Sequence, residues 1–177
     1  MKSLALVILA TSLLTGCFSN SVRQQEEFDS YTLIDDLDPK VLAAKEHIDV
    51  NLKSPLNKGS IVIKTSDVAL RVTNSHKWAQ SLDEQLQLLS ASVLSKYALN
   101  PRISYEINVL QFYGSTNGKV NISLSCKALN ANKTIFVNSY VYEGFQSDDG
   151  YEALVLKLKE GYISIMENIA YDVLAIR

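Results

Sequence analysis

The sequence contains few of the residues from which many functional sites are built. Its 177 residues include two cysteines, two histidines, one tryptophan, three prolines and seven glycines. Two cysteines exclude a disulfide-rich scaffold, and two histidines exclude a histidine-rich metal cluster. Lys and Arg number 17 against 19 Asp and Glu, and the formal net charge of −2 lacks the basic excess of a nucleic-acid-binding domain. No glycine-rich phosphate-binding motif occurs either.

Apolar residues, by contrast, make up 47% of the chain, which is too many for a disordered protein of balanced charge. The length fits one globular domain, and no internal repeat or low-complexity run divides it. We therefore expect one domain with its own hydrophobic core.

The N-terminus has the pattern of an export sequence. Lys2 gives a short cationic start, and residues 4–14 form an apolar stretch interrupted only by Thr11 and Ser12. A transmembrane helix needs about 20 apolar residues, and this stretch is about half as long. A cationic start, a short apolar segment and small residues after it are typical of a signal peptide.

Leu14-Thr15-Gly16-Cys17 resembles the bacterial lipobox. The resemblance implies cleavage after Gly16, a diacylglycerol on the Cys17 thiol and an acyl chain on the new amino group. Phe18 stands where an Asp would favour retention in the inner membrane, so the analogy favours the outer membrane. We predict a signal peptide at 1–16, the lipidated cysteine with a flexible tether at 17–30, and a single periplasmic α/β domain at 31–177. No cofactor is expected apart from the lipid on Cys17.

Apolar periodicity predicts an α/β fold, in the form of an α+β sandwich. Two helices with one apolar stripe each would cover a mixed, mostly antiparallel sheet that includes a three-strand meander. The segment 35–46 is ambiguous, although Asp38-Pro39 could open a short helix there. The predicted strands are 31–34, 48–52, 61–63, 68–72, 103–109, 120–128 and 134–143. The predicted helices are 78–97 and 149 to the C-terminus. Asp149 and Glu152 resemble a capping box at the start of the second helix.

The sequence offers little support for catalysis or metal binding. Cys126 lies in phase with the apolar face of its strand and reads as a core residue. His47 and His76 have no Cys, His or carboxylate at ligand spacing, and no nucleophile motif is present, so neither a zinc site nor an enzyme is expected. Trp78, predicted to open the first helix, is either a core anchor or a partner contact. Tyr140 and Tyr142 share one strand face, where they either pack under a helix or form an amphipathic surface.

Together these segments resemble the PqiC-like family of ABC-type transport auxiliary lipoproteins. The resemblance rests on Cys17, on the opening strand Tyr31-Thr32-Leu33, and above all on His76-Lys77-Trp78-Ala79-Gln80-Ser81-Leu82. Gly118-Lys119-Val120-Asn121-Ile122 and the late helix at Tyr151-Glu152-Ala153-Leu154-Val155 match as well. The loops near residues 35–60 depart from the family's pattern.

The resemblance implies an outer-membrane lipoprotein that faces the periplasm, has an anticodon-binding-like shape and supports membrane integrity. It would dock the tunnel of a mammalian-cell-entry (MCE) domain protein that moves lipids between the membranes, with a homo-oligomeric ring left open as an assembly. No catalytic residue is carried over. Two alternatives stay open: a lipoprotein that carries a lipid or small ligand in an apolar cavity, and a secreted hydrolase that uses His47 or His76.

Overall fold

The computed structural model describes residues 28–34, 38–97 and 100–176. The predicted signal peptide, Cys17 and residues 18–27 of the predicted tether lie outside these ranges. The described elements are, in chain order, β1 (Asp29–Tyr31), α2 (Pro39–Lys45), β2 (Ile48–Leu52), the 3-10 turn η1 (Leu56–Lys58), β3 (Ser60–Ser66), β4 (Ala69–Trp78), α3 (Leu82–Leu94), β5 (Ile103–Ser115), β6 (Lys119–Asn130), β7 (Lys133–Phe145) and α4 (Tyr151–Leu174).

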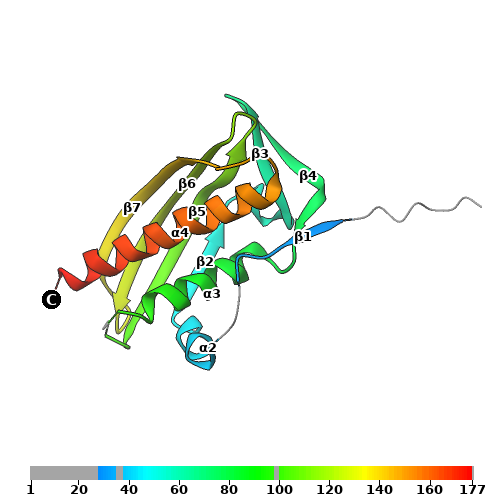
Figure 1. Ribbon diagram of the computed structural model, residues 1–177. Helices are drawn as coiled ribbons and strands as arrows, with labels where there is room; N and C mark the ends of the chain where they lie inside the picture. Colours follow the sequence, from blue (N-terminus) through cyan, green and yellow to red (C-terminus); the bar gives the residue numbers. More distant parts are fainter. Residues whose placement is uncertain (1–27, 35–37, 98–99, 177) are drawn as a thin grey trace, which may run out of the picture.

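The three longest strands form the predicted antiparallel meander β5-β6-β7 (Figure 1). Their turns have the chemistry that a hairpin requires. Gly118 adopts a φ of 78° after Asn117, and Ala131 and Asn132 adopt φ values of 49° and 64° between β6 and β7. Two consecutive residues of positive φ match the right-handed twist of the strands that they join.

Parallel pairs complete the mixed sheet. The edge of β5 that faces away from β6 pairs with β2 along its first half and with β3 near its end, both in parallel. β3 and β4 form an antiparallel hairpin, and β1 pairs in parallel with the last residues of β4. The strand order is β1-β4-β3-β5-β6-β7, with β2 beside β5.

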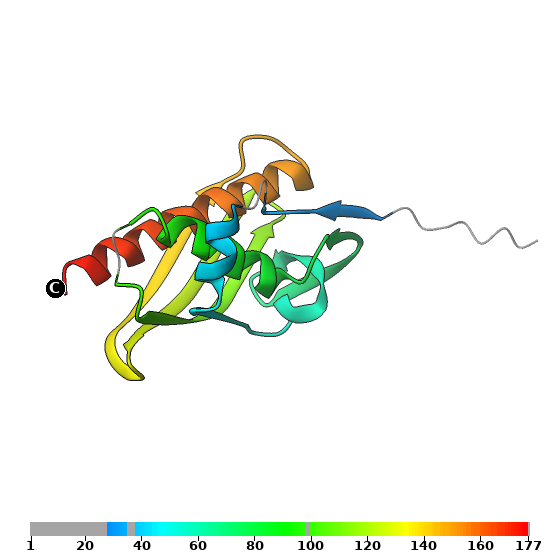
Figure 2. The same cartoon turned by 90° about the horizontal axis from the view of Figure 1, so that it is seen from below.

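The helices lie on one face of this sheet, as Figure 2 shows from below. Strand β6 alternates buried and half-buried residues along its length, which is the pattern of a strand with one face under the helices. The core between the layers is one cluster of apolar side chains that includes Leu86, Ile107, Ile122, Leu124, Leu158 and Ile169. The predicted α+β sandwich is confirmed, with α2 as a third helix packed beside α3.

The start of the first long helix was predicted wrongly. Trp78 is the last residue of β4, and α3 runs from Leu82 to Leu94, so it also ends before Tyr97. The amides of Trp78 and Ala79 donate to the carbonyls of Gly59 and Tyr31, and these bonds keep the chain extended as far as residue 79. The four-residue spacing between Trp78 and Leu82 is therefore coincidental.

Other boundaries differ as well. β1 begins at Asp29 and ends at Tyr31, whereas a strand over 31–34 was predicted, and Val68 lies in the β3–β4 turn instead of a strand. The predicted capping box is absent, because Gly150 is the N-cap of α4 and no side chain caps that end. The φ of 106° at Gly150 explains why a glycine occupies the position.

Candidate functional site

The described residues contain little that is chemically reactive. Cys126 is fully buried in β6, and burial raises the pKa of its thiol to about 12, so that it stays protonated and inert at neutral pH. No three His, Cys, Asp or Glu side chains in the described ranges are grouped closely enough to hold a metal ion. Within the same ranges, no helix is long and apolar enough to cross a bilayer.

His76, isolated in the sequence, has three partners in the fold. Its Nδ1 lies 3.3 Å from a carboxylate oxygen of Asp29 and 3.2 Å from the hydroxyl of Tyr31, both in the first described strand. Its third partner is Tyr151, the first residue of α4. The Tyr151 ring stacks on the imidazole, and the two ring centroids are 3.6 Å apart. His47, in contrast, is exposed after the end of α2.

Next to His76, Lys77 reaches the residue at which the described chain begins. Its Nζ lies 3.7 Å from the centroid of the Phe28 ring, in a cation–π contact. We call Phe28, Asp29, Tyr31, His76, Lys77 and Tyr151 the N-terminal clasp. The sequence motif around Trp78 marked the position of its histidine and lysine, but their partners lie 45 or more residues away along the chain.

Trp78 points into the protein. It is 7% exposed, and its ring lies 6.1 Å from that of Phe112 on β5. This is the position of a core anchor at the junction of β4 and the helix layer. The side chain therefore offers little surface to a partner.

The interior between sheet and helices is filled. Trp78, Leu86, Leu154 and Leu158 are each at most 7% exposed and belong to the same core cluster. Tyr140 and Tyr142 pack under α4, and their hydroxyls donate to Asp172 at 2.6 Å and to Glu160 at 3.3 Å. A lipid carrier would need an apolar cavity at this place.

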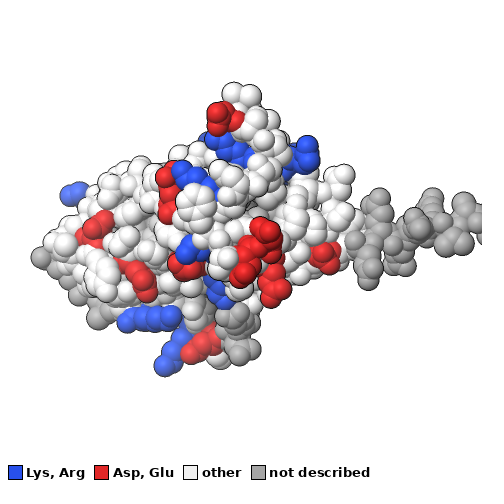
Figure 3. All heavy atoms as spheres, turned by 45° about the horizontal axis from the view of Figure 1, so that its top comes forward, with Lys and Arg blue, Asp and Glu red and all other residues white. Residues whose placement is uncertain are grey.

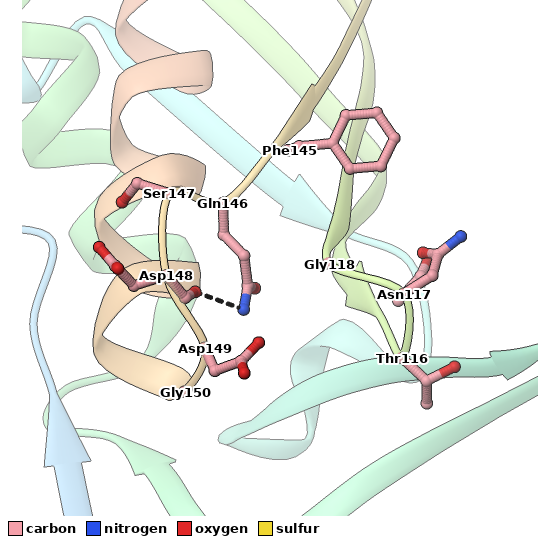
Figure 4. A pocket seen from close by; sticks show the side chains of 10 residues that line it. Thr116, Asn117, Gly118, Phe145, Gln146, Ser147, Asp148, Asp149 and Gly150 are labelled. Atoms are coloured by element: carbon pink, nitrogen blue, oxygen red, sulfur yellow. Dashed lines mark hydrogen bonds between the residues drawn. The ribbon is translucent and has the colours of Figure 1, made fainter.

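Two hollows formed by described residues lie at the surface instead. Figure 4 shows the one between the β5–β6 turn and the β7–α4 loop, of about 710 Å³. Its lining is polar, and the side-chain amide of Gln146 donates to the carbonyl of Asp148 at 2.8 Å. A more apolar groove of about 350 Å³ lies between α2, the end of α3 and the start of β5, where His47 and Tyr97 contribute to the wall. Both are open depressions.

The sheet face without helices carries a row of exposed apolar side chains along β7. Val137, Val141 and Phe145 are 65%, 69% and 64% exposed. They stand opposite Lys127, Ser123 and Lys119 of β6. β7 is also an edge strand of 13 residues with no charged side chain from Thr134 to Tyr142. Edge strands are usually shortened or charged, so this row is a candidate interaction surface.

Charges of both signs alternate over the described part of the face drawn in Figure 3, where Lys and Arg do not merge into a continuous basic patch. On β6, where two lysines stand opposite the exposed row of β7, the cations are paired with carboxylates. Lys119 lies 3.0 Å from Glu143, and Lys127 lies 3.0 Å from Glu106. Such a surface is suited to contacts with protein more than to a polyanion.

Comparison with known proteins shows the family to which the chain is similar. The model of the family described as "ABC-type transport auxiliary lipoprotein component" matches residues 47–170. The chain is also similar to the intermembrane transport lipoprotein PqiC of Escherichia coli (strain K12) and of Shigella flexneri. Each is 28% identical over 134 residues, which cover 70% of this chain and 71% of the relative.

Solved structures share the fold. A crystal structure of an uncharacterized protein superposes with a TM-score of 0.69 at 24% identity, covering 84% of this chain and 99% of the other. A crystal structure of a protein from Xanthomonas campestris has a TM-score of 0.62 at 13% identity, covering 72% and 81%. At these identities the likeness concerns the architecture alone.

Proposed function

Because the chain belongs to the ABC-type transport auxiliary lipoprotein component family, we propose that it docks an intermembrane lipid-transport machine to the outer membrane. In this proposal the acyl chains on Cys17 hold the domain in the outer membrane, facing the periplasm. The partner is an MCE-domain protein that forms a lipid tunnel between the membranes, and the assembly supports outer-membrane integrity. Ring formation by several copies is compatible with this role.

The filled interior favours a docking role over cargo transport. A ligand pocket usually has a volume on the order of 300–1,000 Å³, and the space under the helices is taken up by apolar side chains such as Leu86 and Leu158, both fully buried. What the domain offers instead is surface, including the exposed row Val137, Val141 and Phe145 on β7. The family is a transport auxiliary family and not an enzyme family, which disfavours the hydrolase alternative.

Membrane fractionation and mass spectrometry test the anchor. The wild-type chain should sediment with outer membranes, and its mature N-terminal peptide should begin at Cys17 with a diacylglycerol and an additional acyl chain. Several acyl chains give stable attachment without a spanning helix. The variant Cys17→Ser should be neither lipidated nor found with the outer membranes. An anchored, processed Cys17→Ser chain would refute this part of the proposal.

Co-purification tests the partner. The lipidated chain, extracted in mild detergent, should retain an MCE-domain protein, and the purified domain should carry no stoichiometric phospholipid in native mass spectrometry. A bound phospholipid at one per chain, with no MCE-domain partner, would favour the cargo-carrying alternative.

A further inference from the structure

The described chain enters the domain at the outer edge of the sheet. β1 is only three residues long, and among the described residues it pairs with β4 alone, so that backbone bonds hold it along one side. A strand this short at a sheet edge is marginal on its own. Its position therefore depends on side-chain contacts.

Those contacts come from two consecutive residues at the end of β4. His76 holds Asp29 and Tyr31 through its Nδ1, and Lys77 covers Phe28. Neighbouring residues of a strand point to opposite faces, so the two side chains hold the entering segment from both sides. The His76 side chain is 25% exposed and that of Asp29 is 65% exposed, so both remain close to solvent.

The clasp also includes a residue of α4. Tyr151 stacks on the imidazole, and its ring centroid also lies 6.3 Å from that of Tyr31. Burial raises the pKa of the Tyr31 phenol, and the negative charge of Asp29 raises it further. The phenol therefore stays protonated at neutral pH. The clasp thus joins the entering segment to β4 and to the first turn of α4.

A deeper attachment follows a few residues later. Leu33 is fully buried, and its amide donates to Oε1 of the fully buried Gln85 at 2.7 Å. The Gln85 side-chain amide in turn donates to the carbonyl of Gln80 at 3.0 Å. If the clasp opened, the chain would still be held at Leu33.

We propose that His76 and Lys77 fix the point at which the lipid tether leaves the domain, at Phe28 instead of Leu33. The inference rests on the proposed anchor at Cys17 for its role at the membrane. At about 3.4 Å per extended residue, the eleven residues from Cys17 to Phe28 reach about 37 Å, and opening the clasp to Leu33 adds about 17 Å. The clasp thereby limits how far the domain stands from the bilayer.

Hydrogen exchange of the full lipidated chain in detergent micelles tests the clasp itself. In the double variant His76→Ala/Lys77→Gln, exchange in residues 28–32 should become about tenfold faster, as expected for losing one cation–π contact and one polar cluster at a partly exposed site. Peptides from β6 should keep the wild-type rate. Lys77→Arg, which retains a cation over Phe28, and Arg71→Gln, an exposed cation of the same strand, are the matched controls. Unchanged exchange in 28–32, or equal acceleration in β6, would overturn the clasp.

Energy transfer on vesicles tests its consequence. A donor dye on Val68→Cys, a 97% exposed position, and an acceptor lipid in phosphatidylglycerol–phosphatidylethanolamine vesicles report the distance of the domain from the bilayer. The buried Cys126 will not react with the dye. Transfer efficiency should fall in the double variant and not in the controls. Equal efficiency would overturn the limit on reach, whereas a chain that fails to bind vesicles but shows the exchange result would contradict the lipid anchor alone.

Discussion

A buried pair of hydroxyl groups between α3 and α4 provides a quantitative test of how the helix layer is held together. The Tyr162 hydroxyl lies 2.8 Å from Ser90 Oγ, and Ser90 Oγ donates to the carbonyl of Leu86 at 2.7 Å. Since the single hydroxyl hydrogen of Ser90 goes to Leu86, Tyr162 is the donor to Ser90. Both side chains belong to residues that are 0% exposed.

Removing the two hydroxyl groups singly should therefore have unequal costs. Tyr162→Phe leaves Ser90 bonded to Leu86 and should lower the free energy of unfolding by about 1 kcal/mol. Ser90→Ala leaves a buried phenol without its acceptor, a cost of about 1–3 kcal/mol, from which the helix propensity of alanine recovers about 0.5 kcal/mol. In the double variant no hydroxyl is orphaned, so its cost should be about 1 kcal/mol less than the sum of the two.

Urea unfolding of the unlipidated chain gives the four free energies of this cycle, with constant m-values as the check on two-state behaviour. Far-UV circular dichroism is a suitable probe because α3 and α4 are both long helices. Additivity of the two substitutions within about 0.3 kcal/mol would show that the two hydroxyl groups are not coupled as described.

Three further predictions concern buried and half-buried side chains. Burial raises the pKa of the Cys126 thiol from 9.0 to about 12, so the stability that the buried neutral thiol contributes is full below pH 9 and is lost as the pH rises toward 12. The unfolding free energy of the wild type should accordingly fall more steeply above pH 9 than that of Cys126→Ala, by up to about 1.4 kcal/mol per pH unit, and parallel curves would contradict this. A Cβ on Gly114 would lie 2.5 Å from Leu154 Cδ1, so Gly114→Ala should cost about 1–3 kcal/mol in urea unfolding, and Leu154→Val in the same chain should recover part of it. Tyr140→Phe removes the 2.6 Å bond to Asp172 and should cost about 1 kcal/mol in urea unfolding, with no added cost when Asp172→Ala has already removed the acceptor.

The parts of the fold that local pattern determines could be predicted from the sequence. The meander follows from alternating apolar residues and from turns whose Asn and Gly residues favour positive φ. The stripe from Tyr151 to Val173 predicts α4 because its 3–4 spacing matches a helical face. In both cases the residues that decide the structure are neighbours in the chain.

What could not be predicted depends on distant partners. The parallel pairs β1–β4 and β2–β5 join segments more than 40 residues apart, and no local pattern specifies them. Trp78 was placed in a helix because its spacing to Leu82 fits one, yet strand bonds to Gly59 and Tyr31 decide the conformation there. His76 looked isolated for the same reason, since Asp29 and Tyr151 reach it only through the fold.

Site-specific crosslinking in the cell tests most directly whether the domain docks a transport machine. Photo-reactive residues at Val137, Val141 and Phe145 would probe the exposed row on β7, and one at Leu156, 59% exposed on α4, would probe the helix side. A docking role predicts a covalent adduct with an MCE-domain protein from at least one position, and this adduct should be lost when Cys17→Ser removes the anchor. Adducts that contain no MCE-domain protein at any of these positions, in a chain shown to be lipidated and present in the outer membrane, would contradict it.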